Sequence, residues 1–423
     1  MQNSVGSLMG DPKVRRFLKL LSDRGFVQES LVTINGMEKK LFRFGPQGTL
    51  LRKNIIKEWW DAVVSHQVNT FCLESSPLMI KTNPQNTSSS TESSVRLVSL
   101  DSSSNPVDCA LRASLSKECL EAYLSSLQMT SGQLPLSLAS TGQCFNLKTE
   151  DKSSDNNSKL LNNGLCETHL LSQHYLPPVN VAQAVEFWTR KRLSWWKKFS
   201  TNPSKICSST SSVTNGNKTS ISRTIIGYSF PWGIEPLETI DNHGNSPLLD
   251  LESKSGPSPQ VRHDKAVFHA HLLECQTSVE SCMAAFLTDS YREKTVKATS
   301  SEKKQDIKKV LQLHPLLCPY HVALSVTGSK KKEVFILSQH VAKELREGNL
   351  SVLHLPRNSD SMESQYRRND ELGVPYTVVL SDQTLESGVI IIRSRDTSLK
   401  QQHHIKDLQS ILLTNLHPTE LVK

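Results

Sequence analysis

The stretch GVIIIRSRDT, residues 388–397, decides the fold of the C-terminal part of the chain. Its run of β-prone apolar residues indicates a buried strand. The strand runs into Arg393, Arg395 and Asp396, which fit either a catalytic or ligand-binding cluster or a surface salt bridge at the end of a core strand. Because side chains alternate along a strand, the two arginines share one face and Asp396 takes the other. An ion pair between Asp396 and either arginine therefore requires the strand to end or bulge there.

Helices and strands alternate regularly around this stretch. HVALSV (321–326) and VPYTVVL (374–380) have the composition of strands, whereas VFILSQHVAKELREG (334–348) and IKDLQSILL (405–413) have the periodicity of helices. Short apolar strands separated by amphipathic helices are typical of α/β domains. The last 110 residues or so therefore predict a compact α/β domain with a mainly parallel sheet.

The composition limits the remaining choices. A chain of 423 residues allows two or three compact units. Its nine cysteines include no CxxC pair, which indicates buried thiols in a reducing compartment, and no apolar run approaches the roughly 18 residues of a membrane span. His269 and His271 form an HxH pair without a third ligand nearby, so we expect no metal site. Stretches rich in Ser, Thr and Asn at 86–94, 151–159 and 208–220 predict loops.

The N-terminal segment KVRRFLKLLSDRGF, residues 13–26, has two interpretations. Its lysines and arginines on an amphipathic pattern resemble a mitochondrial presequence, but Asp11 and Asp23 are unusual in one. An ordinary amphipathic helix of the fold accounts for the same pattern without any targeting role.

Two further segments predict long helices. In FGPQGTLLRKNIIKEWWDAVV, residues 44–64, apolar residues recur at helical spacing. In VEFWTRKRLSWWKKF, residues 185–199, tryptophans alternate with lysines and arginines, which fits either stacking on nucleic-acid bases or a core face with a solvated rim. The helical spacing of the aromatic residues favours the core.

Positive charge is concentrated between residues 292 and 332, where ten basic residues and three acidic ones give a net charge of +7, against +8 for the whole chain. The stretch is either a flexible solvated linker or a patch that contacts phosphates. No base-reading motif is visible, so we expect any nucleic-acid binding to be weakly sequence-specific and strongly salt-dependent. The candidate DNA-binding residues are Arg292, Lys294, Lys297, Lys303, Lys304, Lys308 and Lys309.

Several motifs in order carry a resemblance. LHPLLCPYHVALSV, VAKELREG, GVPYTVVL and ESGVIIIRSRDT resemble the anticodon-binding domain of class II aminoacyl-tRNA synthetases of the glycyl, prolyl, histidyl and threonyl group. Together with FGPQGTLLRKNIIKEWW, RKRLSWWKKF and YSFPWG, they make the chain similar to the accessory-subunit family of mitochondrial DNA polymerase gamma, which has a synthetase-like fold without aminoacylation.

The resemblance implies a fold class and a domain order. We expect an α+β class II synthetase-like core, an antiparallel sheet with helices, formed by residues 1–95 and 180–300. Residues 96–179 correspond to a shortened insertion of the dimerisation type with a motif 2-like strand and a disordered loop. Residues 310–423 correspond to the anticodon-binding-like α/β domain. The shortened insertion leaves a homodimer open but argues against it.

The sequence offers no catalytic constellation and no cofactor motif. It contains no GxxxxGK[ST], GxGxxG, HExxH or GxSxG pattern. Class II synthetases hold ATP with an arginine in motif 2 and another in motif 3, because a guanidinium clamps phosphate. Here Asn146 follows Phe145 in the first place, and Val279, Glu280 and Cys282 stand around the second. We therefore expect no aminoacylation.

By resemblance, the chain is a non-catalytic processivity factor of the mitochondrial matrix and its nucleoids. It would bind the catalytic subunit of DNA polymerase gamma and double-stranded or primer-template DNA. The implied partner-binding residues are Leu385, Gly388, Arg393 and Arg395. Two alternatives remain open: a glycyl-tRNA synthetase-like enzyme with replaced ATP contacts, and a tRNA-binding module.

Overall fold

The computed structural model describes most of the chain. The described residues are 11–34, 37–80, 95–97, 109–145, 166–214, 220–255, 260–263, 266–296, 306–328, 331–355 and 360–416. Within them, no helix has both the length and the apolar content needed to cross a bilayer.

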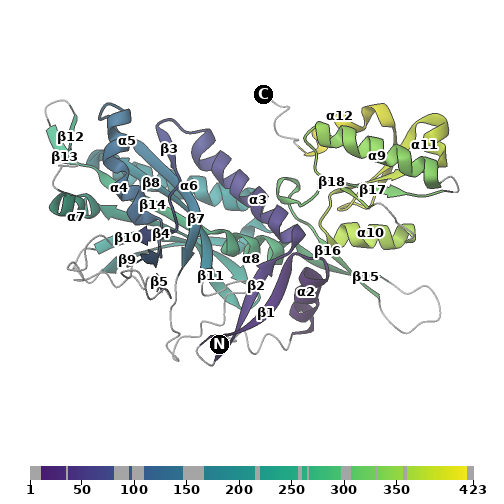
Figure 1. Cartoon of the computed structure of the whole chain (residues 1–423), viewed down its shortest axis with the longest axis horizontal. Coiled ribbons are helices and arrows are strands. Elements are labelled where there is room, and N and C mark those ends of the chain that lie inside the picture. Colours follow the sequence, from purple (N-terminus) through teal and green to yellow (C-terminus); the bar gives the residue numbers. More distant parts are fainter. Residues whose placement is uncertain are drawn as a thin grey trace, which may run out of the picture.

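A seven-stranded sheet forms the centre of the larger part of the molecule (Figure 1). All its neighbours pair antiparallel except the edge pair β3 and β7, which is parallel, so the expected antiparallel sheet is present. In spatial order its strands are β3 (Thr70–Leu73), β7 (Leu136–Phe145), β8 (Cys166–Leu176), β14 (His271–Ser278), β11 (Gly233–Gly244), β10 (Ser220–Phe230) and β9 (Ile206–Thr214). The prediction of a loop at 208–220 is therefore wrong for residues 208–214, which pair with β10.

Three helices pack on one face of this sheet in the largest buried cluster: α3 (Pro46–Trp60), α6 (Val181–Phe199) and α8 (Val279–Ser290). In α3, Leu51, Ile55 and Trp59 are buried at the predicted spacing of four, and Val63 continues the row in the π-helical turn η1 (Asp61–Ser65). The tryptophans of α6 are likewise buried. The core interpretation of these aromatic residues is therefore correct, and base stacking by the tryptophans is excluded by their burial.

Shorter elements cover the other face near β7 and β8. They are α4 (Ser116–Glu121), α5 (Tyr123–Met129), α7 (Ser246–Ser255) and the hairpin of β12 (Gln260–His263) and β13 (Ala266–His269). A second cluster is buried there, in which the rings of Tyr123 and Tyr175 stack with centroids 4.3 Å apart. Both faces of the sheet are thus occupied by side chains in this region.

Small elements complete the N-terminal half. Helix α2 (Pro12–Asp23) precedes the hairpin of β1 (Val27–Ile34) and β2 (Met37–Phe44), and a three-stranded sheet has the order β4 (Leu78–Ile80), β6 (Cys109–Leu111) and β5 (Val95–Leu97). Phe17, Leu20 and Leu21 of α2 are buried in the same cluster as α3 and α6. Residues 12–23 are therefore an integral helix of the fold, as the ordinary-helix interpretation predicts.

The C-terminal domain contains a five-stranded sheet, and its order is β18 (Val352–His354), β17 (Val322–Val326), β19 (Tyr376–Leu380), β20 (Val389–Ser394) and β21 (Lys400–His404). The first two pairings are parallel and the last two are antiparallel. The expectation of a mainly parallel sheet is therefore wrong. Only α11 (Asp382–Ser387) joins β19 to β20, and this connection is shorter than the dozen or so residues that a parallel crossover needs.

Helices lie on both sides of this second sheet (Figure 1). Helices α9 (Lys331–Glu347) and α12 (Leu408–Leu416) bury their apolar residues in a cluster of their own, with the turn η6 (Ile405–Asp407) beside them. Helix α10 (Met362–Glu371) lies on the opposite side, and Leu372 and Val374 after it belong to the cluster of α3 and α6. One hydrophobic core thus continues from the first sheet into the C-terminal domain, through the turn η5 (Pro315–Leu317).

Candidate nucleic-acid and partner interface

The basic stretch forms a hairpin that begins directly after α8. Its strands are β15 (Tyr291–Val296) and β16 (Asp306–Leu311), and Figure 1 shows them leaving the core between α2 and α10. Glu293 lies opposite Lys309, and Lys294 lies opposite Lys308, so the two pairs face opposite sides of the hairpin. Three of the predicted DNA contacts, Lys297, Lys303 and Lys304, lie outside the described residues.

Helix α2 contacts the side of the hairpin that carries Glu293 and Lys309. Arg16 donates two hydrogen bonds to the Glu293 carboxylate, at 2.8 and 2.9 Å, and the Tyr291 hydroxyl donates a third at 2.6 Å. The Phe17 and Tyr291 rings lie 5.0 Å apart. Hydrogen bonding from Arg16 holds the pKa of Glu293 below its usual value, so this carboxylate stays charged near neutral pH. This contact joins segments 277 residues apart in sequence.

Helix α10 contacts the other side. The Lys308 ammonium lies 2.9 Å from a carboxylate oxygen of Asp370, and Arg393 donates two further hydrogen bonds to this carboxylate, at 2.8 and 3.0 Å. Arg24, just after α2, donates to the neighbouring Glu371 at 2.7 Å. Two adjacent carboxylates at the end of α10 thus hold cations from the hairpin, from β20 and from the N-terminal region.

The four described candidates for DNA binding differ in what surrounds them. The Arg292 guanidinium donates to the carbonyl oxygens of Asp289 and Tyr291 at the end of α8, and Lys308 is paired with Asp370. Lys294 is exposed and Lys309 is half-buried, and within the described residues neither has an ion-pair partner. Among the described lysines of the hairpin, Lys294 and Lys309 therefore have ammonium groups available to a ligand, whereas Nη1 of Arg292 is already bonded to backbone carbonyl oxygens. Contact with DNA stays a prediction for all seven residues.

Arg393 and Arg395 are buried, with 4% and 3% of their surface exposed. Strand β20 ends at Ser394, so Arg395 reaches Asp396 with two bonds of 2.8 and 3.0 Å, as the ion pair requires. Arg395 also donates to the carbonyl oxygens of Gly373 (2.7 Å) and Leu313 (3.1 Å).

The interpretation of this cluster as a surface salt bridge is therefore wrong for both arginines. Carbonyl oxygens and a carboxylate buried between the sheets need donors, and a guanidinium offers five. The motif RSRD ties the segment after α10 and the segment before η5 to the second sheet. As partner-binding residues, Arg393 and Arg395 have no accessible guanidinium in this chain and can act only through the groups that they hold.

The two other predicted partner contacts lie at the end of α11. Leu385 is 38% exposed. Gly388 ends the helix with a φ of +70°, and a Cβ there would lie 2.5 Å from Nε2 of His404. Its carbonyl oxygen accepts a hydrogen bond from the Ile405 amide at 2.9 Å. The position requires glycine for both conformation and space, and it fixes the surface on which Leu385 stands.

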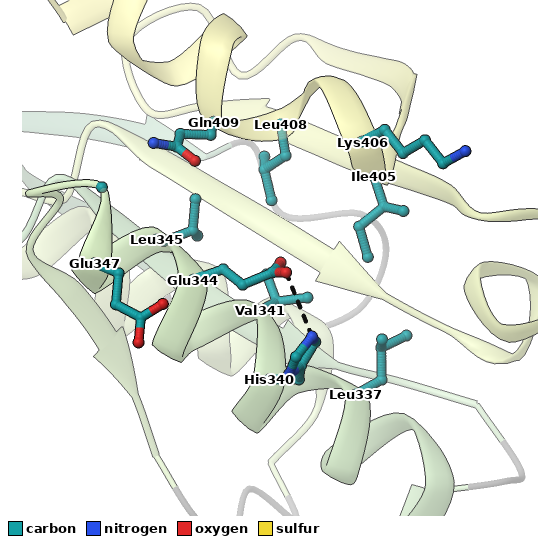
Figure 2. Close-up of a pocket in the computed structure, with 11 residues that line it drawn as sticks. Leu337, His340, Val341, Glu344, Leu345, Glu347, Ile405, Lys406, Leu408 and Gln409 are labelled. Carbon is teal, nitrogen blue, oxygen red and sulfur yellow. Dashed lines mark ion pairs between the residues drawn. The ribbon is translucent and has the colours of Figure 1, made fainter.

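A groove of about 720 Å³ lies between α9 and the segment of η6 and α12 (Figure 2). Leu337, Val341 and Ile405 contribute apolar surface, and His340 pairs with Glu344 at 3.3 Å along one edge. No cysteine or hydroxyl side chain lines the groove. It offers a shape for binding, and its titratable side chains are His340, Glu344, Glu347 and Lys406.

The positions expected to replace the ATP-binding arginines lie in the core. Val279 and Cys282 are fully buried, and Glu280 accepts a hydrogen bond from the Thr168 amide at 2.9 Å. Burial raises the pKa of Glu280. Asn146 lies outside the described residues. The opposite face of the sheet is covered near β7 and β8. Side chains of α4 and α5 pack there against Tyr175.

The histidines singled out in the sequence have ordinary partners. The His269 ring lies 2.8 Å from the Glu252 carboxylate, and burial lowers the pKa of His271. His404 accepts a hydrogen bond from the Lys406 amide at the start of η6, and His403 lies next to it in β21. Over the part of the chain that the structure describes, no three His, Cys, Asp or Glu side chains are placed to hold a metal ion.

Sequence reasoning found the basic stretch by its charge but predicted neither the hairpin nor the contacts that hold it. Asp370, Glu371 and Arg16 are ordinary charged residues of amphipathic helices, and their partners lie 23 to 347 residues away. The one available signal was the pair of arginines directly after a predicted core strand, since a guanidinium that becomes buried needs a carboxylate.

The chain is similar to several known proteins. Residues 321–415 match the family described as "Anticodon binding domain". The chain is 31% identical to DNA polymerase subunit gamma-2 of Mus musculus over 88% of the chain and 83% of that protein, and 30% identical to the Bos taurus protein of the same name over 87% and 78%. It is 22% identical to the glycine–tRNA ligase of Borreliella burgdorferi, over 96% of the chain and 98% of the ligase. These similarities confirm the resemblance stated from the sequence, and the chain belongs to the family of the gamma-2 subunits of DNA polymerase.

Proposed function

We propose that the chain is the non-catalytic accessory subunit of a mitochondrial DNA polymerase, acting in the matrix, in the nucleoid. It binds the catalytic subunit and double-stranded DNA and thereby lengthens each round of synthesis. Family membership supports the polymerase role. The observation that carries DNA binding is the basic hairpin, fixed on one side by α2 and on the other by α10, with Lys294 and Lys309 left for a ligand.

The mode of DNA binding follows from the residue types. Lysine is a flexible point charge that suits phosphate oxygens and carries no base information by itself. Each phosphate that a lysine neutralises releases counterions, so affinity falls as salt rises. The binding is therefore independent of sequence and sensitive to salt.

The catalytic subunit binds the C-terminal domain on the surface around α11. Leu385 is exposed there, Gly388 fixes the turn, and Arg393 and Arg395 hold the sheet beneath it. Residues 1–95 and 180–300 belong to the synthetase-like unit and 310–423 to the anticodon-binding-like unit. The stretch 96–179 corresponds to the shortened insertion, and it also supplies strands β7 and β8 to the sheet of the synthetase-like unit.

The mass in solution tests the partnership. Light scattering on the chain alone, on the catalytic subunit alone and on their mixture gives the composition directly. We expect a monomer of 47.3 kDa alone, because the insertion is short, and a defined complex in the mixture. A mixture whose masses are those of the separate proteins contradicts the proposal, whereas a dimer alone contradicts only the monomer.

A second candidate is a tRNA-binding module, favoured by the match of residues 321–415 to an anticodon-binding family and by the similarity to glycine–tRNA ligases. Competition for a labelled DNA duplex separates the two. We expect unlabelled duplex to compete better than tRNA. A preference for tRNA supports the second candidate, and glycine-dependent pyrophosphate exchange supports a synthetase-like enzyme in place of both.

A further inference from the structure

We propose that helix α2 and the hairpin of β15 and β16 form one continuous duplex-binding surface, on which Lys13 and Lys19 contact the phosphates next to those held by Lys309. The inference rests on the proposed binding of double-stranded DNA and assigns part of that binding to the N-terminal helix.

The spacing in α2 places three of its four cations in one row. Lys13, Arg16 and Lys19 follow one another at intervals of three residues, which makes them a row along the helix. Arg16 is bonded to Glu293, so this row runs beside the hairpin. Lys309 lies directly opposite Glu293 and therefore belongs to the same side of the hairpin.

The charges on this surface are not balanced by acids. Arg16 and Glu293 neutralise each other. Lys13 and Lys19 are exposed, and within the described residues neither has an ion-pair partner. Asp11 is the acid nearest to Lys13 along the chain, and its carboxylate accepts a hydrogen bond from the Lys13 amide at the start of α2. Asp23 is the acid nearest to Lys19, one turn further along α2, and no ion pair joins these two exposed side chains. Positive charge thus remains on both sides of a neutral pair.

The Glu293 carboxylate also lies within the electrostatic reach of Lys13. The pKa of Glu293 is lowered chiefly by the hydrogen bond from Arg16, and the charge of Lys13 lowers it further. Two lysines six residues apart are about 9 Å apart along a helix axis. This distance spans two to three phosphates of one DNA strand, at about 3.4 Å per phosphate.

A basic amphipathic helix can also bind a membrane surface, but only by burying its apolar face in lipid. In α2 this face is occupied, because Phe17, Leu20 and Leu21 are buried in the core. The polar side alone is available, which favours a polyanion with regularly spaced phosphates.

The test compares three double variants of the full chain with equal loss of charge. They are K13Q/K19Q on α2, K294Q/K309Q on the hairpin and K117Q/K343Q on α4 and α9 as a control. The affinity for a duplex DNA is measured by fluorescence anisotropy over a series of salt concentrations. The slope of log affinity against log salt should become shallower by about 2 for K13Q/K19Q, because each phosphate contact contributes about 0.9. It should become shallower by about 1 for K294Q/K309Q, because Lys309 faces α2 and Lys294 faces the opposite side of the hairpin. The control should keep the wild-type slope. A fourth variant, K13R/K19R, should keep it too, because arginine carries the same charge as lysine.

The outcomes separate the two claims. A wild-type slope for K13Q/K19Q beside a reduced slope for K294Q/K309Q overturns the role of α2 and leaves duplex binding by the hairpin standing. If the wild-type chain shows no duplex affinity that falls as salt rises, the proposed binding of double-stranded DNA is itself overturned. An equal loss in the α2 variant and the control contradicts the inference too, since it shows that net charge alone decides. Thermal unfolding of each variant verifies that it is folded.

Discussion

Arg393 and Arg395 illustrate what a sequence pattern does and does not determine at the scale of a residue. The apolar run before them predicts a buried strand, and alternation predicts that they share a face, as they do. The pattern does not say that this face is covered. The covering groups are the Asp370 carboxylate and two backbone carbonyl oxygens, which come from distant segments with no pattern of their own.

The Asp370 carboxylate should be a main support of this region. Asp370→Asn leaves Arg393 buried without a counter-charge, so we expect a loss of about 3–5 kcal/mol in the free energy of unfolding. Asp396→Asn is the matched control: this carboxylate is half-exposed, and Arg395 keeps two carbonyl acceptors, so we expect a loss of at most about 1 kcal/mol. Urea denaturation measures both, and equal losses would contradict the assignment.

The pH dependence of stability should reveal a buried histidine. His174 stacks on Trp188 with ring centroids 3.8 Å apart, and burial lowers its pKa from 6.5 to about 3. As pH falls below 6.5, the unfolded chain takes up a proton that the folded chain excludes. The stability present above pH 6.5 is therefore lost toward pH 3, by up to about 1.4 kcal/mol per pH unit from this group.

His174→Gln should flatten this dependence, because glutamine does not titrate. His340→Gln is the control, since His340 is 68% exposed in its side chain. Denaturation at a series of pH values between 7 and 4 gives the slopes. An unchanged slope in His174→Gln would show that His174 is protonated equally in the folded and unfolded chain.

At the scale of elements, periodicity predicted the helices well and their contacts poorly. Helices α3 and α6 bury the aromatic and aliphatic residues that their spacing indicates. The direction of β20 was mistaken, although the short connection through α11 already excluded a parallel crossover. The contact between α2 and the hairpin was not predictable, because it depends on one ion pair between ordinary surface residue types.

Helix α2 should contribute to the stability of the whole fold. Phe17→Ala removes a buried ring that packs against Tyr291, so we expect a loss of about 3–5 kcal/mol in the free energy of unfolding. Lys19→Ala on the exposed side of the same helix should change it by less than about 0.5 kcal/mol. Chemical denaturation compares the two. A small effect of Phe17→Ala would mean that α2 is only loosely attached.

The lysines of the hairpin should be unequal in DNA binding. Neutralising Lys303, Lys304, Lys308 and Lys309 together should flatten the salt dependence of duplex affinity by about 3 rather than 4, because Lys308 is already paired with Asp370. Lys308→Gln alone should leave the slope unchanged, whereas Lys309→Gln alone should reduce it by about 1. Anisotropy titrations at several salt concentrations measure these slopes, and an unchanged slope in the quadruple variant would make the stretch a solvated linker.

At the scale of the whole molecule, the sequence predicts two units and the structure shows how firmly they are joined. One buried cluster runs from α2 and α3 into the C-terminal domain, and Asn54 donates to the carbonyl oxygen of Cys318 at 2.8 Å across the junction. The candidate DNA surface and the candidate partner surface are therefore held in a fixed relation through α10. Such a relation suits a subunit that must hold a duplex and a polymerase at once.

The accessory role is tested most directly by primer extension. The catalytic subunit is assayed with and without this chain over a series of salt concentrations. The length of product made in a single binding event should increase when the chain is present, and the increase should persist to higher salt than the catalytic subunit tolerates alone. Product lengths that are the same with and without the chain, under conditions in which the two proteins are shown to be folded, would contradict the account.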